Sequence, residues 1–382
     1  MSEVLQTGEQ DPNPHPPRRS TGTRVTIDLA MFPHIGGLIL QMTDWKDLLP
    51  WRLTSKLVCA QVDRLMTSHV IMVDGPEHVL LKSPKGRIPV LRDFVYNRHS
   101  ADSGNAGHGR PVMALSKTTI LDLYLRKIDY EGGGKPSEPF ENLKYMRLHA
   151  FEGDDITRTA VMFPAQTLVT FGDMGLLLQS QVTFRIKVIP ADHIPSCATK
   201  LVINIKFQTV TRYHVDAYQS VTSDTSLLHD GLREVVLVFS NWGRPVSSSF
   251  VKKWPAVVPA NERCLWVVMM VITAIVRGRS KVTIVDLHKV DFHWLFGMTP
   301  PKDVESPHQA ALLQAIHPEA RTSKGISMVR GDADWLPKDY APWTHLLSQL
   351  DVSALEFLTL EEYGLRLTPE DLELEIQEFW GY

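Results

Sequence analysis

The chain has 382 residues, a formal net charge of −3, and charged side chains at 22% of its positions. This near-neutral balance argues against nucleic-acid binding, which needs a surplus of Lys and Arg. The length gives room for two or more domains with a large core. The three cysteines, Cys59, Cys197 and Cys264, are too few and too scattered for a disulfide framework or a metal site. We therefore expect a reducing compartment, the cytosol or the nucleus, and no cofactor.

The first 24 residues are polar and rich in proline. Such a composition cannot bury enough apolar surface to fold, so we expect a disordered tail over residues 1–24. The tail has no apolar stretch typical of a signal peptide. The longest apolar run, Cys264 to Val276, is shorter than the roughly 20 residues that span a bilayer. It predicts a buried helix and no membrane segment.

Residues 25–68 contain three short amphipathic segments. Apolar residues recur at helical spacing in the first segment, from Phe32 to Met42, and a second stripe holds Leu48, Leu49 and Leu53. Thr54 and Ser55 are candidate caps for a third helix, whose apolar residues are Leu57, Val58, Val62 and Leu65. Three helices in about 35 residues cannot bury a core of their own. The segment is therefore typical of a docking module.

The order of residues in this module resembles the F-box, the motif that joins substrate receptors to SCF-type ubiquitin ligases. The resemblance lies in Phe32-Pro33, in the apolar residues from Ile35 to Leu40, in Asp47-Leu48-Leu49, and in the run from Arg52 to Lys56. It covers about a tenth of the chain. It implies contact with the adaptor subunit of the ligase through an apolar helix surface. The residues expected at that contact are Phe32, Pro33, Ile35, Ile39, Leu48, Leu49 and Leu53.

From residue 69 the pattern changes to strands, beginning with His69–Val73. Several later segments share the spacing L-x-x-L-x-L, which is the strand part of a leucine-rich repeat. The copies cover residues 120–125, 143–148, 232–237, 282–287 and 355–360, and weaker copies begin at Leu168 and Ala198. The pattern predicts that the last two apolar positions point inward and that neighbouring strands are parallel. The intervals are irregular, so the array resembles a degenerate repeat of the kind found behind an F-box in fungal proteins.

A mixed α/β domain is the alternative interpretation of residues 69–382, because buried parallel strands also produce apolar runs. An insertion near residues 296–343 interrupts the array and contains one predicted helix, Pro307–Ile316. Its aromatic residues Trp335, Tyr340 and Trp343 could contact a partner, although aromatic side chains more often fix such a segment to the body of the domain.

Motifs that carry chemistry are absent or incomplete. The segment Gly132–Lys135 fails as a phosphate loop because Pro136 stands where Ser or Thr binds Mg²⁺. The dense set Asp286, His288, Asp291 and His293 is the one candidate metal cluster. Because Leu287 is the inward residue of its repeat, we expect Asp286 and His288 to point into solvent and bind no metal. The sequence therefore predicts no enzyme activity.

Taken together, the sequence predicts an α/β protein with a three-helix F-box-like module at residues 25–68. An irregular leucine-rich-repeat-like solenoid of parallel strands follows at residues 69–382. The resemblance implies a substrate-recognition adaptor of an SCF-type (cullin-RING) ubiquitin ligase that holds a protein substrate on its C-terminal array. The expected partners are the adaptor subunit, the cullin complex and a protein substrate. A stand-alone interaction scaffold without a ubiquitin link remains the alternative.

Overall fold

The structure is a computed structural model and describes residues 33–74, 79–84, 86–91, 109–124, 140–149, 163–173, 198–207, 231–241, 267–268, 271, 274–275, 279–316 and 351–377. The chain divides into two compact units, Met1–Asp44 and Trp45–Tyr382. The tail predicted for residues 1–24 lies outside the described residues. The boundary expected between residues 68 and 69 stays a prediction.

Three helices lie at the three predicted amphipathic segments, namely α1 (Pro33–Met42), α2 (Trp45–Trp51) and α3 (Lys56–Thr67). Ser55 caps α3 as predicted, because its side chain accepts a hydrogen bond from the backbone N–H of Val58. Pro50 is the second-last residue of α2. Because proline lacks the N–H that would donate to the carbonyl four residues earlier, it disrupts the helix at this position, and α2 ends directly after it.

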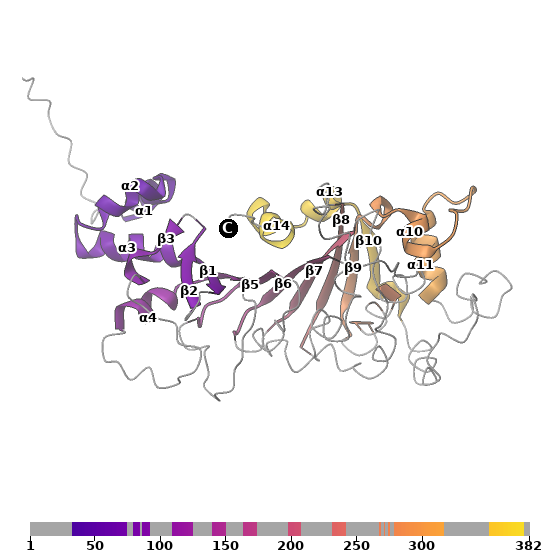
Figure 1. Ribbon diagram of the computed structural model, residues 1–382, viewed down its shortest axis with the longest axis horizontal. Coiled ribbons are helices and arrows are strands. Elements are labelled where there is room, and N and C mark those ends of the chain that lie inside the picture. Colours follow the sequence, from indigo (N-terminus) through magenta and orange to yellow (C-terminus); the bar gives the residue numbers. More distant parts are fainter. Residues whose placement is uncertain are drawn as a thin grey trace, which may run out of the picture. The chain divides into compact units, whose positions relative to one another are not determined.

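The described strands form one ten-stranded sheet in the order β10-β9-β8-β7-β6-β5-β4-β1-β2-β3 (Figure 1). From β1 through β4 to β10 the neighbours are parallel and follow chain order, whereas β2 and β3 are antiparallel strands added beside β1. The strands are β1 (His69–Asp74), β2 (Val79–Ser83), β3 (Gly86–Arg87), β4 (Ile120–Tyr124), β5 (Tyr145–His149), β6 (Thr167–Asp173), β7 (Lys200–Phe207), β8 (Glu234–Asn241), β9 (Lys281–Val285) and β10 (Leu355–Leu358). The predicted α/β class with parallel strands is thus confirmed.

On both faces of the parallel sheet, most of the described residues are buried. Successive residues of a strand point to opposite faces, and the register places Met146, Leu168, Leu201 and Val235 in one row. These four side chains are all buried. On the opposite face, residues such as Tyr145 and Val202 form a core cluster with the C-terminal helices. This explains the near-continuous apolar runs of the strands, which are typical of buried parallel sheets.

The expectation that the equivalent apolar positions of every repeat copy lie on the same face of the sheet is wrong for two copies. Val235 of β8 pairs with Val282 of β9, and not with Val285, which the copy at residues 282–287 places in the equivalent position. Val285 and its neighbour Leu358 instead belong to the cluster beneath the C-terminal helices. Because the side-chain period of a strand is two, this shift of three residues, like any odd shift, moves an apolar residue to the other face.

The C-terminal segment covers one face of the sheet. After β10 come α13 (Leu360–Gly364) and α14 (Pro369–Ile376). Leucines and an isoleucine of this segment, including Leu372 and Ile376, pack against the cluster that holds Val169, Val202 and Val236. We call the side of the sheet that meets this helix the α14 face.

The remaining described elements lie outside the parallel strands. They are η1 (Pro89–Leu91), α4 (Gly109–Leu115), η3 (Leu287–Lys289), α10 (Phe292–Phe296), α11 (Pro307–Ile316) and η7 (Val352–Ala354). The helix predicted at Pro307–Ile316 is confirmed. Within the predicted helix Cys264–Val276, residues 267–268, 271 and 274–275 are helical and buried. No helix in the described part of the chain is both long and apolar enough to cross a bilayer.

Candidate protein-docking surface

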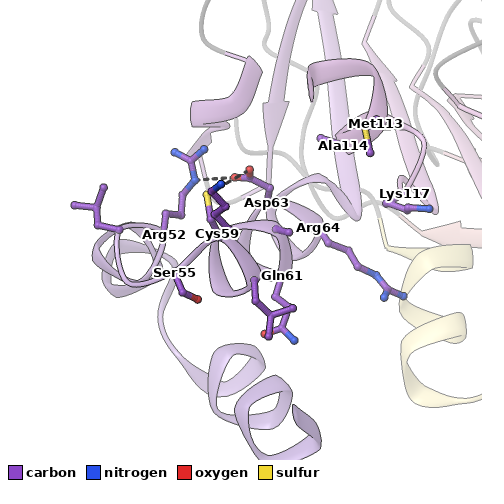
Figure 2. Close-up of a pocket in the computed structure, with 13 residues that line it drawn as sticks. Arg52, Ser55, Cys59, Gln61, Asp63, Arg64, Met113, Ala114 and Lys117 are labelled. Carbon is purple, nitrogen blue, oxygen red and sulfur yellow. Dashed lines mark hydrogen bonds and ion pairs between the residues drawn. The ribbon is translucent and has the colours of Figure 1, made fainter. Parts of the chain in front are cut away.

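A groove of about 870 Å³ lies beside α3. It is lined by residues of the turn after α2, by one side of α3, and by α4 and the turn that follows it (Figure 2). All of these residues belong to the second compact unit.

The local sequence explains why this side of α3 stays open. Val58, Val62 and Met66 recur every four residues and are buried, so they form the inward stripe of the helix. Leu57 precedes this stripe by one position and lies on the outer side of the helix, where it is 52% exposed. The turn between α2 and α3 is fixed by Arg52, whose Nε donates to Asp63 Oδ1 at 2.7 Å.

Exposed apolar side chains surround the groove. Leu53 is 89% exposed, and Met113 of α4 is 71% exposed. Together with Leu57 they line the groove. Large apolar side chains that gather around a concave surface mark an interaction site more strongly than the same residues scattered singly.

The groove is also positively charged. Its cationic lining residues are Arg52, Lys56, Arg64 and Lys117. Among the described residues that line it, Asp63 is the one acidic residue, and it is buried against Arg52. The surface therefore combines apolar contact area with a basic rim, although the whole chain carries a net charge of −3.

The structure places the residues expected at the ligase contact in different environments. Phe32 lies outside the described residues, and Pro33 is the first residue of α1. Ile35 is 39% exposed and Ile39 is half-buried. Leu48 is buried, Leu49 is half-buried, and Leu53 is exposed.

Leu48 is buried in this chain, so it offers little area to a partner. Leu57 and Met113 were not predicted as surface residues. Spacing could have found Leu57, because it stands one residue before the Val58–Val62–Met66 stripe. Met113 carries no such signal, since α4 is brought beside α3 by tertiary packing, including a hydrogen bond from Thr67 Oγ1 to the carbonyl of Ala114 at 2.9 Å.

A second polar cluster lies on the α14 face, where β1, β4 and β5 are neighbours. Asp122 accepts from His69 Nε2 at 2.9 Å and from Arg147 Nη1 at 3.2 Å, and Nε2 of His149 is 3.6 Å away. The imidazole of His149 stacks between Tyr124 and another aromatic ring. Burial opposes ionisation of Asp122, but the two histidines and Arg147 together hold its pKa well below its usual range.

The expectation that Asp286 points into solvent is wrong. Asp286 is buried; its Oδ1 accepts from the backbone N–H of Leu360 at 3.0 Å, and its Oδ2 accepts from Lys289 Nζ at 2.6 Å. The carboxylate thus joins the end of β9 to α13. No group of His, Cys, Asp or Glu that could hold a metal ion occurs among the residues that the structure describes. The segment Gly132–Lys135 and the aromatic residues Trp335, Tyr340 and Trp343 lie outside them.

Comparison with known proteins finds no matching family model, no matching curated protein and no matching solved structure. The functional interpretation therefore depends on the residues and geometry of this chain.

Proposed function

We propose that the chain is a substrate-recognition adaptor of an SCF-type ubiquitin ligase. The F-box-like helices would dock on the adaptor subunit of the ligase, and the C-terminal array would hold a protein substrate. In this role the chain makes and breaks no bond itself. It raises the effective concentration of a substrate lysine near the ubiquitin carrier.

The observation that carries the proposal is the exposed apolar surface at the F-box-like segment. Leu53 and Leu57 flank the Thr54-Ser55-Lys56 step on which the resemblance partly rests, and both side chains project toward solvent. Two leucines gain about 3–6 kcal/mol if a partner buries them fully. An exposed pair of this size at the segment that resembles a docking motif favours a partner over a purely internal role.

The order of the strands supports the substrate-binding half of the proposal. Parallel strands that follow chain order in the sheet agree with a leucine-rich-repeat-type solenoid, in which each unit stacks on the one before it. The equivalent positions 120, 145 and 167 recur at intervals within the roughly 20–29 residues of such repeats, whereas later intervals are longer. We therefore interpret residues 69–382 as an irregular array of this type.

Binding of a recombinant SCF adaptor subunit to the full chain tests the proposal. Replacement of Leu53 and Leu57 by Asp is expected to weaken binding at least tenfold, because tenfold corresponds to only about 1.4 kcal/mol. The matched control is Leu365→Asp, since Leu365 is an equally apolar residue that is 84% exposed after α13. No binding by the wild-type chain, or equal binding by the double variant and the control, would contradict the proposal.

A stand-alone scaffold is the second candidate function, and one observation favours it. The helix α3 is integrated with the sheet, because the carbonyl of Ser68 directly after it accepts from the backbone N–H groups of Thr119 and Ile120 at 2.9 and 3.1 Å. A helix that covers the end of a solenoid is built in this way. The scaffold predicts that affinity capture of the full chain from cells recovers no cullin subunit, whereas the adaptor predicts that it does.

A further inference from the structure

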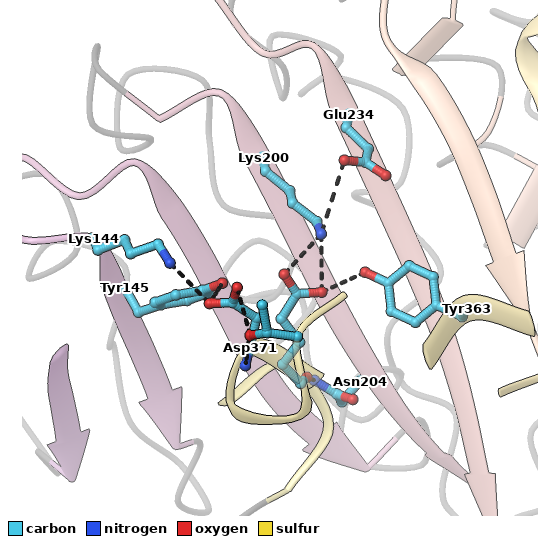
Figure 3. Close-up of polar contacts among 9 residues, drawn as sticks. Lys144, Tyr145, Lys200, Asn204, Glu234, Tyr363 and Asp371 are labelled. Carbon is cyan, nitrogen blue, oxygen red and sulfur yellow. Dashed lines mark hydrogen bonds and ion pairs between the residues drawn. The ribbon is translucent and has the colours of Figure 1, made fainter. Parts of the chain in front are cut away.

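The helix α14 is held on the sheet by two carboxylates one helical turn apart. Asp371 Oδ1 accepts from Lys144 Nζ at 2.9 Å and from the hydroxyl of Tyr145 at 2.7 Å (Figure 3). Glu375, four residues later, accepts from Lys200 Nζ at 2.7 and 2.9 Å. It also accepts from the hydroxyl of Tyr363. Each of these two carboxylates therefore contacts one lysine and one tyrosine.

The sheet also contacts the backbone at the end of the helix. Asn204 Nδ2 donates to the carbonyl of Glu375 at 2.7 Å, and Arg147 Nη2 donates to the carbonyl of Gln377. The last carbonyls of a helix have no partner within the helix, so these donors recognise a helix that ends at this place. The α14 face thus contacts both the charged side chains of α14 and the backbone at its C-terminal end.

Apolar contacts complete the interface. Leu372, Leu374 and Ile376 are half-buried and pack on the cluster that includes Val202 and Val236, both of which are fully buried. The outer side of the same helix carries acidic residues that are exposed to solvent. The segment is therefore an amphipathic acidic helix that packs on the basic and apolar α14 face.

A permanent cover of a sheet has no need of these charges. Well-packed apolar residues stabilise an interior as well as buried ion pairs or better, because each buried charge loses its hydration. Burial raises the pKa of Glu375 despite its contact with Lys200, so the ionised form of this carboxylate is disfavoured at the interface. Buried charge pairs do serve specificity and register at interfaces that form between separate partners.

We propose that the α14 face is a docking surface for a short acidic helix of another protein, with two carboxylates one turn apart among leucine or isoleucine residues. In the isolated chain α14 occupies this surface and imitates that partner. The inference deepens the proposed function, on which it rests only for identifying the partner as the ligase substrate. A substrate therefore binds to the α14 face by displacing α14.

A labelled peptide with the sequence of residues 367–377 serves as the probe, and its binding to the full chain is measured by fluorescence anisotropy. Replacement of Asp371 by Asn and Glu375 by Gln weakens the internal contact, so this variant is expected to bind the peptide at least tenfold more tightly than the wild type. Addition of Lys144→Gln and Lys200→Gln is expected to remove the gain. The matched control is Glu361→Gln with Glu370→Gln, which removes the same charge from exposed positions of α13 and α14.

Two results overturn the inference: a variant that keeps the wild-type circular dichroism but binds no more tightly than the control, or a gain that survives the lysine replacements. If the variant does not fold, hydrogen exchange of the wild-type chain decides. Backbone amides of α14 that exchange at least tenfold faster than those of β7 support displacement, and equal protection overturns it. No ligase subunit takes part in these measurements, so this inference and the proposed function fail separately.

Discussion

At the scale of single residues, Asp122 shows how the sheet keeps charge away from water. Its side chain is fully buried and lies between Arg147 on the next strand and His69 on the strand before. A buried carboxylate without such partners would cost several kcal/mol. The three residues are far apart in sequence and only the register of β1, β4 and β5 unites them, so no local pattern in the sequence indicates the cluster.

Replacement of Asp122 by Asn is expected to lower the free energy of unfolding by about 3–5 kcal/mol, because it replaces the buried carboxylate that contacts Arg147 by a neutral amide. Urea unfolding at pH 7 measures this loss. The control Asp303→Asn changes an exposed aspartate and is expected to shift stability by no more than about 0.5 kcal/mol. Equal losses in the two variants would show that Arg147 does not depend on Asp122.

The same pair predicts how stability depends on pH. Because the pKa of Asp122 is lowered in the folded chain, its contribution is present above the ordinary aspartate pKa near 3.9 and is lost as the pH falls below it. The gap in stability between the wild type and Asp122→Asn is therefore expected to narrow in acid. Unfolding curves between pH 7 and pH 3 check the direction, and a gap that widens toward pH 3 would contradict it.

At the scale of elements, apolar runs were sufficient to place the parallel strands, whereas β2 and β3 were not predicted. The helix α11 begins and ends where the sequence predicts. The C-terminal helices were missed although their signals are present. Thr359 and Glu362 form a capping box at the start of α13, and Thr368 followed by Pro369 begins α14. Their position on the sheet could not be predicted, because Asp371 and Glu375 find their lysines more than a hundred residues earlier in the chain.

The ion pairs that hold β10 beside β9 give a prediction at the scale of elements. Glu356 accepts from Arg366 at 2.5 and 2.7 Å, and it forms an ion pair with Lys281 of β9 at 2.7 Å. Hydrogen bonds from Arg366 and then from Lys281 lower the pKa of Glu356 to about 2. Because these groups are partly exposed and screened by solvent, Glu356→Gln is expected to cost no more than about 1 kcal/mol at pH 7.

The difference between wild type and Glu356→Gln depends on pH in a definite direction. It is complete above the ordinary glutamate pKa of 4.5 and disappears as the pH falls toward 2, since the folded carboxylate stays ionised to lower pH than the unfolded one. Thermal unfolding from pH 7 to pH 2.5 measures it, with the exposed Glu305→Gln as control. A difference that persists unchanged at pH 2.5 would exclude the ion pairs as its cause.

At the scale of the whole molecule, the sequence indicates parallel strands that follow chain order, because similar apolar segments recur along it. It does not indicate how the helices before residue 69 relate to the sheet. Val58, Val62 and Met66 form an apolar stripe that fits either a separate module or a sheet cover. In the structure this stripe is buried, and Thr67 Oγ1 is bonded to the carbonyl of Ala114 inside the second unit.

This arrangement predicts that α2 and α3 are needed by the sheet. Removal of Val58, Val62 and Met66 with the rest of residues 1–68 loses about 1.5–3 kcal/mol for each buried side chain, a sum comparable to the roughly 5–15 kcal/mol that stabilises a typical domain. The chain of residues 45–382 is therefore expected to unfold cooperatively in circular dichroism. The chain of residues 69–382 is expected to melt at a much lower temperature or not to fold.

The comparison of these two truncations bears on the boundary expected at residue 68. If both melt at the same temperature, α2 and α3 contribute nothing to the sheet and residues 25–68 form a module of their own, as the F-box resemblance implies. If only residues 45–382 fold, α2 and α3 stabilise the sheet through the buried Val58–Val62–Met66 stripe. They can then contact a partner only through the outward side that carries Leu53 and Leu57. The second result is the one that the buried stripe predicts, and it makes the surface variants, rather than truncations, the decisive test of ligase docking.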